Sequence, residues 1–354
     1  MFLESLYINN FKSIEEKNLS FVNGVNCVVG PNGSGKTNLL DSIYYLSLCK
    51  SYFGTPDASG IRFGQQYFSL QGTFERLGER HVVACAVTSD KKKIFKRNDK
   101  QYDRLSEHIG LLPLIMITPH DINIINGPGE ERRRFFDTLI CQLDHDYLKF
   151  IGAYGKLLID RNKILKTENR NIDRDLISVI DERMAYFGQK IYQKRMFACH
   201  EITPLAQKLY STIASSEEIS IGYESQLHNY DLLTQFQRSF DKDRALGFTS
   251  AGIHRDDFSF SMNGKPIRNF GSQGQKKSFL MSLKFGQYMY TSKQLGLQPI
   301  LILDDLFDKL DHSRVGHVVE IITGSDFGQI FISDTDRNNL SGIFPGEDAK
   351  IIQL

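Results

Sequence analysis

The sequence predicts an α/β fold in which a β-rich domain is built from both ends of the chain and a mostly helical insertion lies between them. A glycine-rich segment, Gly30–Thr37, stands between a strand-like apolar run and a helix-like one. A second apolar run, Ile300–Leu303, ends in paired aspartates. Helical spacing of apolar residues dominates the middle of the chain. We therefore predict one domain from residues 1–120 and 248–354, and a helical insertion domain at 121–247.

Composition bounds the possible functions. The chain has 354 residues, enough for one large or two ordinary domains, and its 41% hydrophobic and 24% charged residues are typical of soluble proteins. The five cysteines form no C-x-x-C pair, which indicates reduced thiols in a cytoplasmic protein. The N-terminus lacks the pattern of a secretory signal, and no apolar run has membrane-spanning length. The net charge is +1, so any DNA contact must come from local patches.

The segment Gly-Pro-Asn-Gly-Ser-Gly-Lys-Thr fits the phosphate-binding pattern G-x-x-x-x-G-K-[ST]. Val25–Val29 before it predicts a buried strand, and Asn38–Leu48 after it predicts a helix. Glycines let successive N–H groups surround an anion, and the helix start adds unpaired N–H donors. The lysine would bridge the outer phosphates of a nucleotide, and the threonine would hold Mg²⁺. The alternative is a chance glycine-rich turn. The predicted nucleotide-binding residues are Gly30, Pro31, Asn32, Gly33, Ser34, Gly35, Lys36, Thr37 and Asn38.

Strand-like runs precede and follow this segment. Further strands are predicted at Leu3–Ile8, Leu19–Val22, Tyr67–Phe74, His81–Thr88 and Leu111–Thr118. Lys91–Tyr102 predicts a hairpin with Asn98-Asp99 at its tip. It carries six cations, Lys91, Lys92, Lys93, Lys96, Arg97 and Lys100. These are either a solvated basic surface or a phosphate-contacting one.

The insertion reads as two helical tracts. The first runs from about Glu130 to Leu165, and the second from Asp175 to about Ile213 with an interruption at Pro204. Ile219–Leu227 is open to a strand. No heptad repeat is sustained, so no long coiled coil is expected. The cluster Arg132–Arg134 is a candidate for DNA or partner contact, although it could equally pair with the neighbouring acids Glu130, Glu131 and Asp137.

β-like texture returns after residue 248. Phe258–Met262 is followed by Asn263-Gly264, a strong hairpin-turn signal. Ser272-Gln273-Gly274-Gln275 then opens a helix predicted to reach about Gly286. A serine at a helix start makes an anion site by the same logic as the glycine loop, or it is simply an N-cap. A last strand is predicted at Gln329–Ser333.

Ile300–Leu303 predicts a buried parallel strand that carries its two acids to the edge of the sheet where ligands bind. Asp304 would complete the coordination of Mg²⁺, directly or through water. Asp305 would orient and polarise the attacking water. With Lys36, these are the predicted catalytic residues, and Thr37 with Asp304 is the predicted magnesium site. The alternative is an ordinary carboxylate at a strand end.

The order of these motifs resembles the ATP-binding-cassette fold of the SMC-like branch. The opening of this chain, Leu6-x-Ile8-x-Asn10-Phe11-Lys12-Ser13, is also typical of that branch. The whole chain is similar to the RecF family of bacterial recombination mediators. The resembling stretches lie in the family's order along nearly the full length: Gly30–Asn38, Pro119–Asp121, Gly127–Asp137, His254–Asp257, Ser272–Lys277 and Leu303–Asp311.

The resemblance implies an ATPase head that dimerises around ATP. Lys36 and Thr37 of one head, with Ser272 and Gly274 of the other, would clasp one γ-phosphate, and Asp308–Asp311 would lie along the dimer seam. It also implies binding to double-stranded DNA and single-strand/double-strand junctions. The expected partners are RecR, often RecO, and a second copy of the chain, which together load the recombinase RecA at gaps. ATP and Mg²⁺ are the expected cofactors.

Two departures from transporter-type cassettes predict slow hydrolysis, with ATP acting as a conformational signal. The second acid is Asp305 where those cassettes carry Glu, and no histidine lies near Asp334-Thr335, where their switch histidine would fall. One alternative function is an SMC-like nuclease, which would need a further acidic metal cluster. The other is a DNA clamp that binds ATP without cleaving it. A transporter subunit does not suit the inserted helices.

Overall fold

A computed structural model describes residues 1–166, 173–213, 217–305, 312–324, 327–335 and 349–354. Its contacts divide the chain into two compact units. Unit 1 comprises Met1–Asp121, Thr212–Ser215 and Lys284–Leu354, and unit 2 comprises Ile122–Ser211 and Ser216–Leu283. The first boundary between the two units, at 121/122, lies close to the predicted domain boundary at 120/121. Residues 248–283, which the sequence places in the β-rich domain, group with unit 2.

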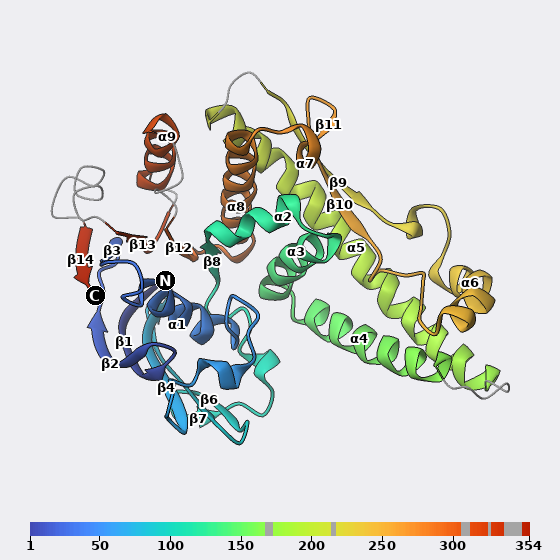
Figure 1. The fold of residues 1–354 in the computed structure, drawn as a ribbon, viewed down its shortest axis with the longest axis horizontal. Helices are drawn as coiled ribbons and strands as arrows, with labels where there is room; N and C mark the ends of the chain where they lie inside the picture. Colours follow the sequence, from blue (N-terminus) through green and yellow to red (C-terminus); the bar gives the residue numbers. More distant parts are fainter. Residues whose placement is uncertain (167–172, 214–216, 306–311, 325–326, 336–348) are drawn as a thin grey trace. The chain divides into compact units, whose positions relative to one another are not determined.

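Figure 1 shows the elements. The strands are β1 (Phe2–Phe11), β2 (Ile14–Ser20), β3 (Val25–Val29), β4 (Tyr67–Arg76), β5 (Glu79–Thr88), β6 (Lys93–Arg97), β7 (Lys100–Gln101), β8 (Leu114–Ile117), β9 (Ile219–Glu224), β10 (Asp257–Met262), β11 (Lys265–Pro266), β12 (Ile300–Leu303), β13 (Ile330–Asp334) and β14 (Ala349–Gln353). The α-helices are α1 (Lys36–Leu48), α2 (Ile122–Asn126), α3 (Gly129–Leu143), α4 (His145–Leu165), α5 (Arg174–Ile213), α6 (Leu232–Leu246), α7 (Ile267–Phe270), α8 (Gln273–Leu295) and α9 (His312–Thr323). No helix among the described ranges combines the length and apolarity that a membrane crossing requires.

The described part of unit 1 holds two sheets. One is antiparallel in the order β2-β1-β4-β5-β6-β7, and the other is parallel in the order β14-β3-β13-β12-β8. Helix α1 contacts strands of both sheets, among them β1, β4, β8 and β13. It is accordingly buried on nearly every side instead of along the single apolar stripe that the sequence predicts.

Burial of α1 is tolerable because its polar groups have partners inside the unit. Asp41 accepts hydrogen bonds from Ser51 and Tyr52 and pairs with Lys12 at 2.7 Å. Ser47 donates to the Leu112 carbonyl. A buried polar group without such partners would cost about 1–3 kcal/mol. The helix is therefore fixed between the sheets by apolar packing and by directed polar contacts.

Unit 2 combines helices with a three-stranded antiparallel sheet, β11-β10-β9. The Phe136 ring of α3 stacks on Phe258 of β10 with centroids 3.8 Å apart, which joins helix to sheet. The predicted interruption at Pro204 is wrong, because α5 runs through that residue without ending. Proline removes one backbone hydrogen bond, but the Thr203 hydroxyl donates to the Cys199 carbonyl beside it at 2.7 Å, and the inner side of the helix is buried.

The two hairpin turns that the sequence predicts are confirmed. Asn98 and Asp99 between β6 and β7 have φ of +48° and +63°, and Asn263 and Gly264 between β10 and β11 have +49° and +75°. Two-residue turns need such positive φ values to match the twist of their strands. Asparagine, aspartate and glycine tolerate them best, which explains why these pairs stand there.

Candidate nucleotide-binding site

The candidate site lies at the carboxyl edge of the parallel sheet, where three neighbouring strands end. β13 pairs with β3 on one side and β12 on the other, all parallel (Figure 1). The glycine loop follows β3, the paired acids follow β12, and Ser333-Asp334 closes β13. The topology thus brings together residues that are about 300 positions apart in the sequence.

The loop between β3 and α1 has the backbone of an anion cradle. Gly33 and Gly35 have φ of +83° and +101°, values that L side chains rarely adopt. α1 begins at Lys36, two residues before the predicted start. The Lys36 ammonium is buried and donates to the carbonyls of Gly30 at 2.8 Å and Pro31 at 3.2 Å. The cation is therefore folded over its own loop, where a phosphate would offer it better acceptors.

Two hydroxyls converge on one carboxylate oxygen at the edge of the sheet. Thr37 Oγ1 donates to Asp304 Oδ1 at 3.2 Å, and Ser333 Oγ donates to the same oxygen at 2.8 Å. Asp304 is only 3% exposed. Burial raises the pKa of its carboxyl above the ordinary value, and these hydrogen bonds act in the opposite direction. The predicted magnesium ligands Thr37 and Asp304 are thus in contact.

Asp305 occupies a different position beside the same serine. It has φ of +45°, in the left-handed region, and its N–H donates to Ser333 Oγ at 2.8 Å. Its carboxylate oxygen Oδ1 lies 3.3 Å from that hydroxyl. The side chain is partly exposed, unlike that of Asp304. One buried acid beside the loop threonine and one accessible acid next to it suit different tasks.

Two residues that take part in the site were not predicted from the sequence. Ser333 bridges both acids, and the only signal was its place just before an aspartate at a strand end. Ser13 accepts a hydrogen bond from Asn38 Nδ2 at 2.7 Å, which ties the opening motif to the start of α1. A Cβ placed on Gly35 would lie 3.2 Å from Ser13 Oγ, a tight contact that adds to the strain of its positive φ.

The residues present fit a nucleotide with magnesium. Ser34 Oγ is buried and makes no hydrogen bond within the described chain. The loop exposes a run of backbone beside the buried ammonium of Lys36, as phosphate binding requires. The hydroxyl of Thr37 and the carboxylate of Asp304 are the hard oxygen donors that Mg²⁺ prefers. Within the described ranges, no cluster of three or more His, Cys, Asp or Glu residues is arranged to hold a metal.

The chain is similar to known proteins along nearly its whole length. The family description "RecF/RecN/SMC N terminal domain" matches residues 2–343. A protein of Parabacteroides distasonis called "DNA replication and repair protein RecF" is 43% identical over 97% of this chain and 94% of its own length. Its counterpart in Flavobacterium johnsoniae is also 43% identical, over 97% of this chain and 96% of its own length. The chain belongs to the RecF family.

Solved structures support the assignment. A structure of the "recombination mediator protein RecF-ATPrS in RecFOR pathway" aligns with a TM-score of 0.89 at 26% identity, over 100% of this chain and 96% of its own. An Smc head domain from Pyrococcus furiosus aligns over 99% of this chain and 93% of its own, with a TM-score of 0.58 at 16% identity. The second likeness shows the fold alone. The predicted SMC-like ATPase fold without a long coiled coil is thereby confirmed.

The segment Ser272–Gln275 of this RecF-family chain lies at the start of α8 in unit 2. Ser272 Oγ accepts from the Gln275 N–H at 3.2 Å, and Gln275 Oε1 accepts from the Ser272 N–H at 2.7 Å. This reciprocal pair is a capping box. Gln275 Nε2 also donates to Glu217, while Gln273 and Gly274 form the first turn. The serine is exposed, so its cross-dimer role stays a prediction. Asp308 and Asp311, predicted at the dimer seam, lie outside the described residues.

The predicted DNA contacts divide into engaged and exposed cations. Arg132 forms a bidentate pair with Asp257 at 2.7 and 2.8 Å and also donates to the Gly127 carbonyl. Arg133 donates to the Asp256 carbonyl at 2.5 Å. Their acidic neighbours in sequence are therefore not their main partners, whereas Arg134 does pair with its neighbour Glu131 at 2.9 Å. Lys93 pairs with Asp57 inside unit 1 at 3.0 Å. The exposed cations of the hairpin are Lys91, Lys92, Lys96 and Lys100.

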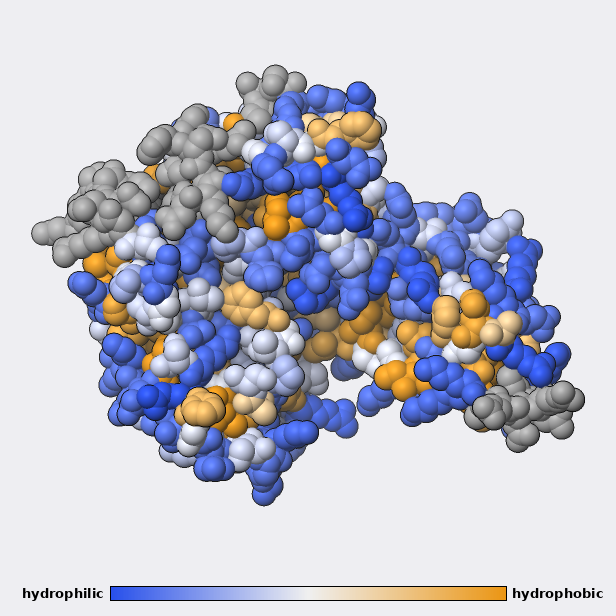
Figure 2. Space-filling model, in the orientation of Figure 1, coloured by the Kyte–Doolittle hydropathy of each residue, from blue (hydrophilic) through white to orange (hydrophobic). Residues whose placement is uncertain are grey.

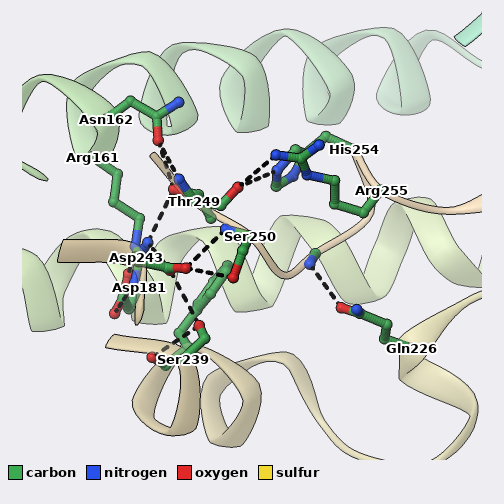
Figure 3. A network of polar contacts seen from close by, with 12 residues as sticks. Arg161, Asn162, Asp181, Gln226, Ser239, Asp243, Thr249, Ser250, His254 and Arg255 are labelled. Carbon is green, nitrogen blue, oxygen red and sulfur yellow. Dashed lines mark hydrogen bonds and ion pairs between the residues drawn. The ribbon is translucent and has the colours of Figure 1, made fainter. Parts of the chain in front are cut away.

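The family stretch His254–Asp257 follows a buried polar network in unit 2 (Figure 3). Arg161 of α4 donates to Asp181 at 2.6 Å and to Asp243 at 2.7 Å, and it is fully buried. Asp243 also accepts from the backbone and hydroxyl of Ser250. Further contacts drawn there involve Asn162, Thr249, Arg255, His254, Ser239 and Gln226. These bonds fix the backbone that presents Asp256 and Asp257 to the arginines of α3 and α5.

Proposed function

We propose that this chain is an ATP-dependent DNA-binding recombination mediator that acts in DNA repair and at replication forks in the cytoplasm. Nucleotide would hold two copies of the chain together on double-stranded DNA or a single-strand/double-strand junction. Slow, DNA-stimulated hydrolysis would release them. RecR would be the partner in loading recombinase at gaps, with or without RecO. The similarity to relatives called DNA replication and repair protein RecF, and to solved structures of RecF in the RecFOR pathway, supports this assignment.

The observation that carries the proposal is the contact between Thr37 and Asp304. A phosphate loop alone indicates anion binding. A loop hydroxyl in contact with a buried strand-end carboxylate supplies, in addition, a pair of oxygens suited to one divalent cation. Magnesium, when bound, would neutralise charge on the phosphates. Asp304 is already held toward this position by Ser333, so little reorganisation would be needed.

Each loop residue has a defined task in this scheme. The N–H groups of Gly33 to Thr37 would donate to phosphate oxygens, and the Lys36 ammonium would exchange loop carbonyls for the outer phosphates. Asp305 would accept a hydrogen bond from the attacking water, because its carboxylate is partly exposed beside the buried Asp304. Aspartate reaches less far than glutamate, which favours slow turnover. A turnover of tens per second without partners would contradict this.

Sedimentation of the wild type and two variants tests the scheme. The wild type should dimerise with ATP and Mg²⁺ and shift further with a gapped duplex. Lys36→Arg should stay monomeric, because the longer planar guanidinium does not fit the loop. Asp305→Asn should bind ATP and trap the dimer. An oligomeric state that ignores nucleotide would overturn the cross-dimer arrangement, and an Asp305→Asn variant with wild-type turnover and dimer lifetime would favour a clamp that binds ATP without cleaving it.

A further inference from the structure

The β6–β7 hairpin has two chemically different faces. Alternate residues of β6 point inward and outward: Lys93, Phe95 and Arg97 are buried or partly buried, while Ile94 and Lys96 are exposed. The hairpin and its flanks, residues 91–102, carry six cations against the single acid Asp99, in a chain whose net charge is only +1. In Figure 2 the lowest edge of the molecule is hydrophilic, with a hydrophobic patch just above it.

The inward face holds the end of the phosphate-loop helix. The Lys93 ammonium donates to the carbonyl of Cys49, the residue that caps the C-terminus of α1. It also donates to both carboxylate oxygens of Asp57 at 3.0 and 3.1 Å and lies 4.7 Å from the centre of the Tyr45 ring. A cation at this position satisfies a terminal carbonyl and complements the negative end of the helix dipole. The cation is thus part of the α1 terminus.

A second link joins the chain after the hairpin to the same helix. His108 Nε2 lies 2.7 Å from the Leu46 carbonyl, so this nitrogen carries the proton. Its Nδ1 then accepts from the Tyr102 hydroxyl at 3.1 Å. His108 is fully buried, and its ring lies beside Phe95 of β6 with centroids 4.8 Å apart. The hairpin is therefore fastened to two carbonyls of the last turn of α1.

The outward face presents cations with few neighbouring acids. Lys96 lies opposite Ala84 of β5 and Gln101 of β7, and Ile94 lies opposite Ala86. Lys91 and Lys100 are exposed. The Lys92 side chain is 79% exposed although its ammonium lies 3.5 Å from Asp90. Flexible, hydrated ammonium groups on a surface of small uncharged side chains suit a polyanion approached through its phosphates.

We propose that the hairpin is a DNA-responsive lever on the nucleotide site. Its outward lysines contact the phosphates of duplex DNA, and Lys93 transmits that contact to α1, whose other end is the phosphate loop. Lys93 is a positioning residue in this arrangement and touches no DNA. The inference rests on the proposed function, since it assumes that the chain binds both ATP and DNA. It adds the surface and the physical connection through which one ligand alters the affinity for the other.

The outward face is tested by the salt dependence of DNA binding. The double variant Lys96→Ala with Lys100→Ala should bind a duplex more weakly, and its slope of log affinity against log salt should fall by roughly two, about 0.9 for each lost phosphate contact. Lys17→Ala removes an exposed lysine from β2, the opposite edge strand of the same sheet. It should retain the wild-type slope. An unchanged slope in the double variant would place DNA elsewhere and overturn the proposal.

The inward face is tested by the ratio of ATP affinities measured with and without duplex. In the wild type this ratio should differ from one. In Lys93→Met it should approach one, while duplex affinity stays within about twofold of the wild type. A variant that kept the wild-type ratio would overturn the lever, and so would one that lost the DNA contact itself.

A second variant covers the case in which Lys93→Met fails to fold. Asp57→Asn leaves the lysine in place but removes the charge that holds it, so the ratio should fall toward one, and thermal unfolding reports the fold. A wild type that binds neither ATP nor duplex would contradict the proposed function itself. A wild type that binds both, with a ratio of one, would contradict only the lever.

Discussion

Thr37 and Asp304 are separated by 267 positions in the sequence, and yet the hydroxyl of one donates to the carboxylate of the other at 3.2 Å. The contact exists because β3 and β12 flank β13 in one parallel sheet, so both strands end at the same edge of that sheet. The carboxylate is buried there, without solvent to stabilise its charge. The site is therefore built at some cost to the stability of the fold.

Replacement of Asp304 by asparagine should expose that cost. Burial raises the pKa of the carboxyl above 3.8, so ionisation destabilises the folded state as the pH rises through the raised value. Asp304→Asn should therefore unfold at a higher temperature than the wild type at neutral pH, and the difference should shrink as the pH falls toward 3.8. It should also lose magnesium-dependent ATP binding. A variant less stable than the wild type at neutral pH would contradict the argument.

The capping box at Ser272 allows folding and association to be separated. Aspartate is as good an N-cap as serine, and its charge suits a helix start. Ser272→Asp should therefore change the free energy of unfolding by only a few tenths of a kcal/mol. It should abolish ATP-dependent dimerisation, because a carboxylate would repel the γ-phosphate of the other head. Ser272→Thr is the matched control. If Ser272→Asp sedimented with ATP as the wild type does, the serine would act only as a helix cap.

The Arg161 network should dominate the stability of unit 2. Arg161→Met leaves Asp181 and Asp243 buried without their cation, which should cost about 3–5 kcal/mol in the free energy of unfolding. Lys163 lies two residues further along α4 in an exposed pair with Asp160. Lys163→Ala should cost less than about 1 kcal/mol. Urea unfolding of both variants checks the contrast, and equal costs would show that burial of the pair does not set its importance.

His254 should make unit 2 sensitive to mild acid. Burial lowers the pKa of its ring to about 4, and its Nε2 lies 3.1 Å from the Thr249 carbonyl. The unfolded chain binds the proton near pH 6.5, and the folded chain binds it only near pH 4. The contribution of neutral His254 to the free energy of unfolding is therefore fully present above pH 6.5 and is lost as the pH falls from 6.5 to 4. The loss should be on the order of 3 kcal/mol. His254→Gln should remove this part of the slope in a pH series of unfolding curves. If the wild type and His254→Gln showed the same slope, another titrating group would be responsible for it.

Local chemistry allowed much of this structure to be predicted. Val25–Val29 and Ile300–Leu303 are strands with the predicted bounds, because short apolar runs beside glycine and acidic residues leave few alternatives. The hairpin turn at Asn98-Asp99 followed from the residues that tolerate positive φ. The predicted interruption at Pro204 is wrong because burial of α5 outweighs the loss of one backbone hydrogen bond.

Partners that are distant in sequence could not be predicted from spacing. The Arg132 cluster has nearby acids, yet Arg132 pairs with Asp257, 125 positions away. In the sequence, Lys93 looks like one more surface lysine. In the structure, it donates to Asp57 and to the carbonyl at the end of α1. Ser333 carried no motif at all. Each of these depends on which strands become neighbours, and a one-dimensional pattern does not contain that information.

The order of the parallel sheet bears on how the protein is made. The strand that leads into the phosphate loop, β3, pairs only with β13 and β14 among the described strands, and both belong to the last 25 residues of the chain. A ribosome finishes the loop early, but β3 has no ladder to join until β13, about 300 residues later, has been made. Pairing across so long a separation is slow. A prematurely terminated chain would therefore carry the complete glycine motif and still lack a folded place for ATP.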